Sequence, residues 1–107
     1  MIRNSSHKVL VNLLLNATQA AGENGAIEVR LEERNEGVCI QVHDSGPGLT
    51  EEQTEHLFEA FYTTKPDGTG LGLAVSRELV TGMGGALHCR NGSSGATFEI
   101  ELPGRPA

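Results

Sequence analysis

Hydrophobic positions near the start of the chain recur at steps of three and four residues, which is the spacing of an amphipathic helix. We expect this helix over 4–25, with Ser5 or Ser6 as its cap and Gly22 or Gly25 at its end. Its apolar face is expected to comprise Val9, Leu10, Leu13, Leu14, Ala17, Ala20 and Ala21.

Alternating apolar and polar residues follow this helix and predict two strands, over 26–34 and 37–44. The "NEG" between them favours a hairpin, so the strands are expected to pair antiparallel. One face of the pair should be exposed to solvent and the other should pack on the helix. The packed face is expected to carry Ile27, Val29 and Leu31 from the first strand and Val38, Ile40 and Val42 from the second.

A short helix and a loop come next. The helix is predicted over 49–61, where Thr50 and Gln53 have the spacing of a capping box and two glutamates suit the positive end of the helix. The loop is "YTTKPDGTG". Phe58 and Phe61 are three residues apart just before it, and we expect them to be core contacts that anchor it.

A third helix and a second hairpin complete the pattern. The helix is predicted over 71–85, and strands over 86–91 and 96–103 are joined by "GSSG". Because strands and helices do not alternate strictly, we expect a single α/β domain over 1–107. Its architecture should be a two-layer sandwich, in which a mixed, mostly antiparallel sheet carries helices on one face. The third helix is expected to bury Leu73, Val75 and Leu79.

Charge and composition narrow the classes of partner. The net charge of −6 over 107 residues disfavours nucleic acid and anionic membranes, although backbone N–H groups can still bind a small anion. No apolar run is long enough to span a bilayer and the start lacks a signal peptide, so we expect a cytoplasmic protein. Cys39 and Cys89 are expected to be free thiols, with a disulfide as the alternative.

Two asparagines of the first helix are candidates for binding a cation. Asn12 and Asn16 are four residues apart and share one face, between closely flanking apolar residues. Two stacked amides there would suit a hydrated cation that accepts neutral oxygens. A polar stripe facing water is the alternative, and spacing alone does not decide between the two.

The stretch "PDGTGLGLAV" is a candidate phosphate site. Gly68, Gly70 and Gly72 lie just before and at the start of a helix, where glycines let the backbone approach a ligand and the N–H groups point at it. Lys65 is the one cation of the preceding loop and can reach a phosphate. A flexible connection with a solvated lysine is the alternative.

Asp44 is the third candidate. It ends an alternating strand and precedes Gly46 and Gly48 in "HDSGPGL". A turn-forming aspartate that binds its own backbone is one interpretation. A carboxylate that binds a ligand's amino group is the other.

Five segments, taken in order, resemble the catalytic ATP-binding domain of sensor histidine kinases. They are "NLLLNATQA", "DSGPGL", "LFEAFYTTK", "GTGLGLA" and "GATFEIELP", and the resemblance runs from about His7 to Pro103. The wider superfamily includes type II topoisomerase subunits, heat-shock protein 90 and the mismatch-repair ATPases. The resemblance implies a Bergerat-type ATP-binding fold, and Lys65 resembles a lysine of the short-lid, nitrogen-regulator type.

The resemblance also implies ATP and Mg²⁺ as ligands. Asn16 and Asn12 would ligate Mg²⁺ between the nucleotide phosphates, and Asp44 would accept a hydrogen bond from the adenine amino group. Gly46 and Gly48 would shape the adenine pocket. The other implied contacts are Phe61 at the lid, Lys65, Gly68, Thr69, Gly70, Leu71 and Gly72 at the phosphates, and Thr97 at the adenine.

Asn12 bears on the reaction. In the superfamily's ATPases a glutamate typically stands four residues before the metal asparagine as general base, and an amide cannot take that role. The resemblance therefore favours phosphoryl transfer, with Asn12, Asn16 and Lys65 as catalytic residues, to a histidine on a separate dimerisation domain. A self-sufficient ATPase and a non-catalytic nucleotide-binding module are the alternatives.

Gln19 and Ala20 depart from the kinase pattern, because many histidine kinases carry a basic and an aromatic residue there. We therefore expect modest nucleotide affinity. No phosphoacceptor histidine motif is present, so the chain is expected to be one domain of a longer kinase. We expect it to be monomeric in isolation and to act indirectly on a response regulator.

Overall fold

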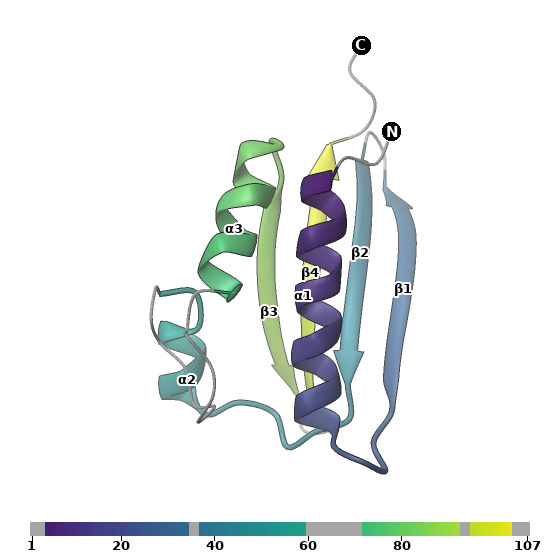
Figure 1. Cartoon of the computed structure of the whole chain (residues 1–107), viewed down its shortest axis with the longest axis vertical. Coiled ribbons are helices and arrows are strands. Elements are labelled where there is room, and N and C mark those ends of the chain that lie inside the picture. The colour runs from purple at the N-terminus through teal and green to yellow at the C-terminus, as the bar shows by residue number, and fades with distance from the viewer. Residues whose placement is uncertain (1–3, 35–36, 60–71, 93–94, 104–107) are drawn as a thin grey trace.

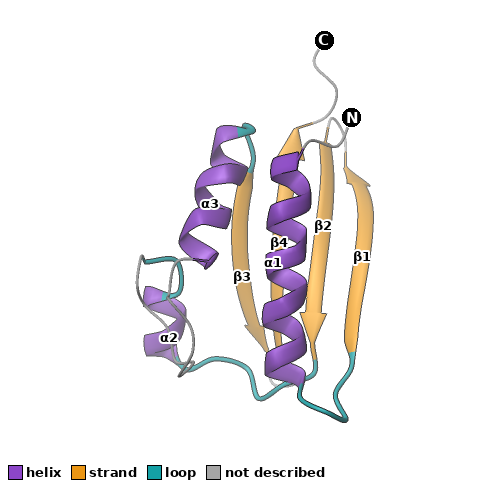
Figure 2. Cartoon of the chain, in the orientation of Figure 1, coloured by secondary structure: helices purple, strands orange, loops and turns teal. Residues whose placement is uncertain are grey.

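The computed structural model describes residues 4–34, 37–59, 72–92 and 95–103 (Figure 1). Its elements in chain order are α1 (Asn4–Ala21), β1 (Ile27–Arg34), β2 (Gly37–Asp44), α2 (Glu51–His56), α3 (Gly72–Gly82), β3 (Ala86–Gly92) and β4 (Gly95–Pro103). The strands form one layer, and the two long helices α1 and α3 cover one face of it (Figure 2). The predicted two-layer α/β sandwich is confirmed.

The described sheet is four-stranded, in the order β1-β2-β4-β3, and its pairings are all antiparallel. The last strand of the chain, β4, therefore inserts between β2 and β3. This topology brings the end of β2, the start of β4 and the end of β3 to one end of the sheet (Figure 1). That end is where Asp44 lies.

The core lies between the sheet and the two long helices. Val9, Leu13 and Ala17 of α1 are four residues apart and each at most 1% exposed, so they form the buried stripe of the helix. The other buried members of this core are Val42, Leu57, Val80, Leu87, Phe98 and Ile100.

The apolar face of β1 is not covered by α1, contrary to expectation. Val29 and Leu31 are 51% and 72% exposed. They lie opposite Val42 and Ile40, so they do face the helix side of the sheet. However, α1 packs over β2 and hardly reaches the edge strand (Figure 1). The alternation predicted the strand correctly but could not show which strand the helix would cover.

The helices differ from prediction at single positions. Because α1 begins at Asn4, neither Ser5 nor Ser6 lies before it as a cap, and it ends as predicted just before Gly22, which takes the left-handed conformation common there. In α3, Val75 is 47% exposed and is not part of the core, whereas Val80 is fully buried.

The described helices include none that is long and apolar enough to cross a membrane. The two cysteines are free thiols, as predicted, with Cys39 buried and Cys89 partly exposed.

Candidate functional site

Asp44 ends β2 on the helix side of the sheet and is only 2% exposed. Its Oδ1 accepts a 2.9 Å hydrogen bond from the backbone N–H of Gly46, so the side chain does form the turn that follows the strand. A turn of this kind works equally well at the surface, and burying a carboxylate costs free energy. The burial of Asp44 is therefore not explained by the turn alone.

The backbone packs tightly around Asp44. A Cβ on Gly46 would lie 2.4 Å from the carbonyl oxygen of Ala20 and 3.0 Å from Asp44 Oδ1. A Cβ on Gly95 would lie 1.8 Å from the carbonyl oxygen of Asp44, and the φ of Gly95 is +123°, which favours glycine. Gly46 is the predicted site glycine, and Gly95 was missed, although its place in "GSSG" marked a turn.

The turn after Asp44 is tied to its surroundings at both ends. At its start, Ser45 N–H donates to the Ala26 carbonyl at 3.0 Å, and Ser45 Oγ accepts from Ala26 N–H at 2.7 Å. At its far end, Leu49 is bonded through its backbone to the side chain of Asn91 on β3. Gly48 lies between these ties. The turn therefore crosses the end of the sheet in a fixed place.

Asn12 faces the start of α3. Its Nδ2 donates to Ser76 Oγ at 3.0 Å, and Ser76 is only 3% exposed. A Cβ on Gly72, the first residue of α3, would lie 2.7 Å from Asn12 Oδ1. The amide oxygen is thus directed at a helix N-terminus, where anions bind. Asn16 lies one turn further along the same flank of α1 and is half-buried.

Thr97 is not brought to Asp44. It pairs with His43 in the β2–β4 register, and its Oγ1 lies 2.7 Å from His43 Nδ1. Because neighbouring residues of a strand face opposite sides of the sheet, Thr97 lies on the open face and Ala96 on the side of Asp44. The implied contact of the Thr97 side chain with adenine does not fit this placement.

Several predicted site residues lie outside the part of the chain that the structure describes. They are Phe61, Lys65, Gly68, Thr69, Gly70 and Leu71.

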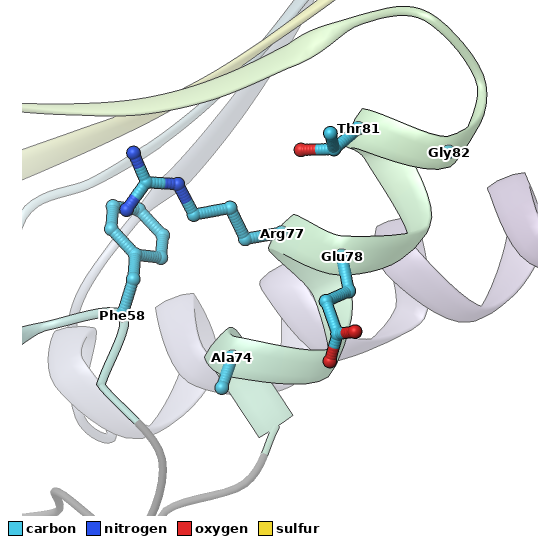
Figure 3. Close-up of a pocket in the computed structure, with 6 residues that line it drawn as sticks. All are labelled: Phe58, Ala74, Arg77, Glu78, Thr81 and Gly82. Carbon is cyan, nitrogen blue, oxygen red and sulfur yellow. The ribbon is translucent and has the colours of Figure 1, made fainter.

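Phe58 joins α3 to the core. The Arg77 guanidinium carbon lies 4.9 Å from the centre of the Phe58 ring, and that ring meets Phe98 edge-on, with centroids 6.4 Å apart. This agrees with the prediction that Phe58 is a core contact. A hollow of about 560 Å³ lies beside this pair (Figure 3), lined by Phe58, Ala74, Arg77, Glu78, Thr81 and Gly82.

The hollow is separate from the asparagine site. Its α3 residues project from the side of that helix opposite Ser76, which is the partner of Asn12. Within the described ranges, no group of three or more His, Cys, Asp or Glu side chains could hold a metal ion. A metal would therefore depend on amide oxygens and on oxygens that a ligand brings.

Cys89 on β3 is an ionisable residue on which the charge of Asp44 acts. Burial is the main cause that raises the pKa of the Cys89 thiol to about 11, and the negative charge of Asp44 is the second cause. The thiol is therefore protonated at neutral pH and has little nucleophilic character.

Comparison with known proteins places the chain in a family. Residues 2–106 match the model of the histidine kinase-, DNA gyrase B-, and HSP90-like ATPases. The C4-dicarboxylate transport sensor protein DctB of Rhizobium meliloti is 48% identical over 97 residues, covering 89% of this chain and 16% of the relative. Sensor histidine kinase ZraS of Escherichia coli K12 is 44% identical over 97 residues, covering 90% and 21%. The chain thus spans a small part of these relatives.

Solved structures show the same relationship. The catalytic domain of histidine kinase ThkA, in a nucleotide-free form, matches with a TM-score of 0.89 and 39% identity, covering 98% of this chain and 71% of that one. The mycobacterial sensor histidine kinase MprB matches with a TM-score of 0.86 and 30% identity, covering 96% and 74%. The chain therefore belongs to the histidine kinase-, DNA gyrase B- and HSP90-like ATPase family, with the fold of histidine kinase catalytic domains.

Proposed function

We propose that this chain binds ATP with Mg²⁺ and positions the γ-phosphoryl group for transfer to a histidine on a separate dimerisation domain of a two-component sensor kinase. The observation that carries the proposal is the buried Asp44 at the sheet end, whose burial the turn does not require. The similarity to ZraS and MprB, which are named sensor histidine kinases, supports it.

Asp44 is the residue that would recognise the base. One of its carboxylate oxygens is held by Gly46 N–H, which fixes the plane of the group. The other oxygen can accept a hydrogen bond from an exocyclic amino group such as that of adenine. A carbonyl at the same position, as in guanine, would meet a like partial charge. In a buried setting this difference counts for more than it would in water.

The phosphate end would be formed by α1 and the start of α3. Asn12 Oδ1 and the amide of Asn16 supply neutral oxygens, and Mg²⁺ accepts these beside phosphate oxygens and water. Donation of Asn12 Nδ2 to Ser76 keeps the oxygen, rather than the nitrogen, directed at this site. When bound, Mg²⁺ supplies charge neutralisation of the phosphates. The donor set of α1 therefore fits that ion.

The chemistry expected of this site needs no general base. A neutral imidazole nitrogen carries its own lone pair, so an N–P bond can form while the bond from phosphorus to the ADP oxygen breaks. Water, by contrast, must lose a proton during the reaction. Asn12 cannot accept that proton, and its hydrogen-bond partner in the described structure is the Ser76 hydroxyl. The protein's contribution is mainly positioning and charge stabilisation.

Two experiments separate the proposal from its rivals. First, the chain is incubated with γ-labelled ATP and Mg²⁺, alone and with the histidine-bearing dimerisation fragment of its parent protein. Label on the fragment's histidine supports the proposal, whereas steady phosphate release by the chain alone would identify a self-sufficient ATPase. Second, calorimetric titration with nucleotide shows whether the chain binds it. Binding without labelling of any histidine would identify a regulatory module.

A cytoplasmic location, a monomeric isolated chain and an indirect action on a response regulator belong to the same proposal. The oligomeric state is measurable on the isolated chain, and the other two on the parent protein.

A further inference from the structure

We infer that Asn91 is a positioning residue for nucleotide binding: its side-chain amide clamps the backbone of Leu49 and so holds the turn that Asp44 begins. The inference rests on the proposed role of Asp44 in binding the base. Asn91 itself is not required to touch the nucleotide.

The clamp has two points of attachment. Leu49 N–H donates to Asn91 Oδ1 at 2.8 Å, and Asn91 Nδ2 donates to the Leu49 carbonyl at 2.5 Å, across 42 positions of sequence. An asparagine amide presents one acceptor and two donors in one plane, so it can engage both groups of a single residue. Two bonds fix the orientation of that backbone as well as its distance from β3.

The register places the clamp in line with Asp44. Asn91 lies opposite Ala96 on β4, and Thr97 lies opposite His43 on β2. One step along, Ala96 stands beside Asp44, so Asp44, Ala96 and Asn91 occupy one row across the helix side of the sheet. The turn leaves this row at Asp44 and returns to it at Leu49.

The clamp matters because the middle of the turn has little else to hold it. The middle of the turn is Gly46, Pro47 and Gly48, and the proline ring is its one side chain that can pack. The start is tied by Ser45 and Ala26, at 3.0 Å and 2.7 Å. Without Asn91 the far end would keep the packing of the half-buried Leu49 side chain on the core and the cap that Thr50 and Gln53 form at the start of α2. The turn would stay attached, but the Asp44 carboxylate that its Gly46 N–H orients would be held less firmly.

Loosening the turn should weaken base recognition more than phosphate binding. A hydrogen bond to the base depends steeply on distance and angle, whereas attraction of the phosphates does not require that alignment. Adenine affinity and the preference for adenine over guanine should therefore fall together.

The test is calorimetric titration of the native chain and Asn91→Ala with Mg²⁺·ADP and with Mg²⁺·GDP. Loss of two side-chain to backbone bonds should weaken ADP binding about five- to tenfold and GDP binding less than twofold. Asn91→Asp keeps the acceptor for Leu49 N–H and loses the donor, so its ADP affinity should lie between those of the native chain and Asn91→Ala. Gln53→Ala is the matched control, because it too removes a bond from a side-chain amide to the backbone. Gln53 Oε1 accepts at 2.9 Å from the N–H of Thr50, the residue after Leu49.

Unchanged ADP affinity in Asn91→Ala would overturn the inference. An equal loss for both nucleotides, which leaves the ADP-to-GDP preference unchanged, would overturn it too, since it would report a smaller folded fraction rather than a displaced turn. The proposed function fails separately, by a native chain that does not bind ADP or by Asp44→Asn binding it normally. If the native chain binds ADP and Asp44→Asn does not, the Asn91 result bears on the clamp alone.

Discussion

Replacing Asp44 by asparagine tests the base assignment with the least disturbance of the fold. Asparagine has nearly the same shape and can still offer an oxygen to Gly46 N–H, which donates to Asp44 Oδ1 at 2.9 Å. The second carboxylate oxygen becomes an NH₂ group, which cannot accept from an adenine amino group. The substitution therefore changes the chemistry of the site while keeping the turn.

The expected loss follows from the burial of Asp44, which is 2% exposed. A hydrogen bond to a charged group contributes about 1.5–3 kcal/mol, and a donor left facing another donor in a buried site adds about 1 kcal/mol or more. A total of about 3 kcal/mol corresponds to about 150-fold weaker binding. Folding should not suffer, because a buried neutral amide is less costly to desolvate than a carboxylate.

Titration calorimetry with Mg²⁺·ATP, together with thermal unfolding of both proteins, measures the two effects separately. We expect Asp44→Asn to unfold at or above the temperature of the native chain while binding ATP far more weakly. Equal affinity in the two proteins would refute the assignment of Asp44 to adenine. A variant that unfolds early would refute the structural reasoning, since the Gly46 bond would then not have been kept.

Three further predictions concern stability. In Gly95→Ala the new Cβ would lie 1.8 Å from the carbonyl oxygen of Asp44, so the free energy of unfolding in urea should fall by about 2–4 kcal/mol. Gly22→Ala is the control: nothing lies within 4 Å of its Cβ, and the free energy of unfolding should fall by about 1 kcal/mol. Val42→Ala, at 0% exposure, should cost about 1–3 kcal/mol, and Leu31→Ala, at 72% exposure, less than about 0.5 kcal/mol; equal costs would contradict the described packing of α1. Hydrogen bonding from Gln41, with help from Arg90, holds the pKa of Glu99 below its ordinary 4.5. The ionised Glu99 therefore contributes to the free energy of unfolding above pH 4.5, and this contribution is lost as the pH falls through the lowered pKa. Glu99→Gln should therefore flatten the acid limb of the stability profile, and an unchanged limb would contradict this.

The elements themselves were predictable because each depends on local chemistry. The capping box at Thr50 and Gln53 forms as expected, with bonds of 3.0 Å and 2.9 Å, because both partners lie within one turn of the chain. Alternation likewise predicted β1 and β2, and "GSSG" indicated the hairpin of β3 and β4. The exposure of β1 was not predictable, because it depends on which strand α1 lies over, and local sequence does not set that.

The candidate site was predictable in the same uneven way. Asp44 and Asn12 could be named because each carries its chemistry in a short motif. Thr97 was assigned to the base, but its side of the sheet depends on the β2–β4 register, which pairs it with His43. Asn91 and Gly95 act on the turn from the other hairpin, at distances in sequence that no local pattern records. Long-range register therefore decided what sequence reasoning missed.

The two ends of the site are built from different parts of the fold, and this makes their roles separable. The proposed base end depends on the sheet and the backbone turn, whereas the proposed phosphate end depends on Asn12, held by Ser76, and on the start of α3. Asn12→Ala should therefore weaken ADP binding in the presence of Mg²⁺ and leave binding in EDTA, and the preference over GDP, unchanged. Ser76→Ala, which frees the amide to rotate, should show a smaller loss of the same kind. An equal loss with and without Mg²⁺ would show that Asn12 supports the fold and does not serve the metal.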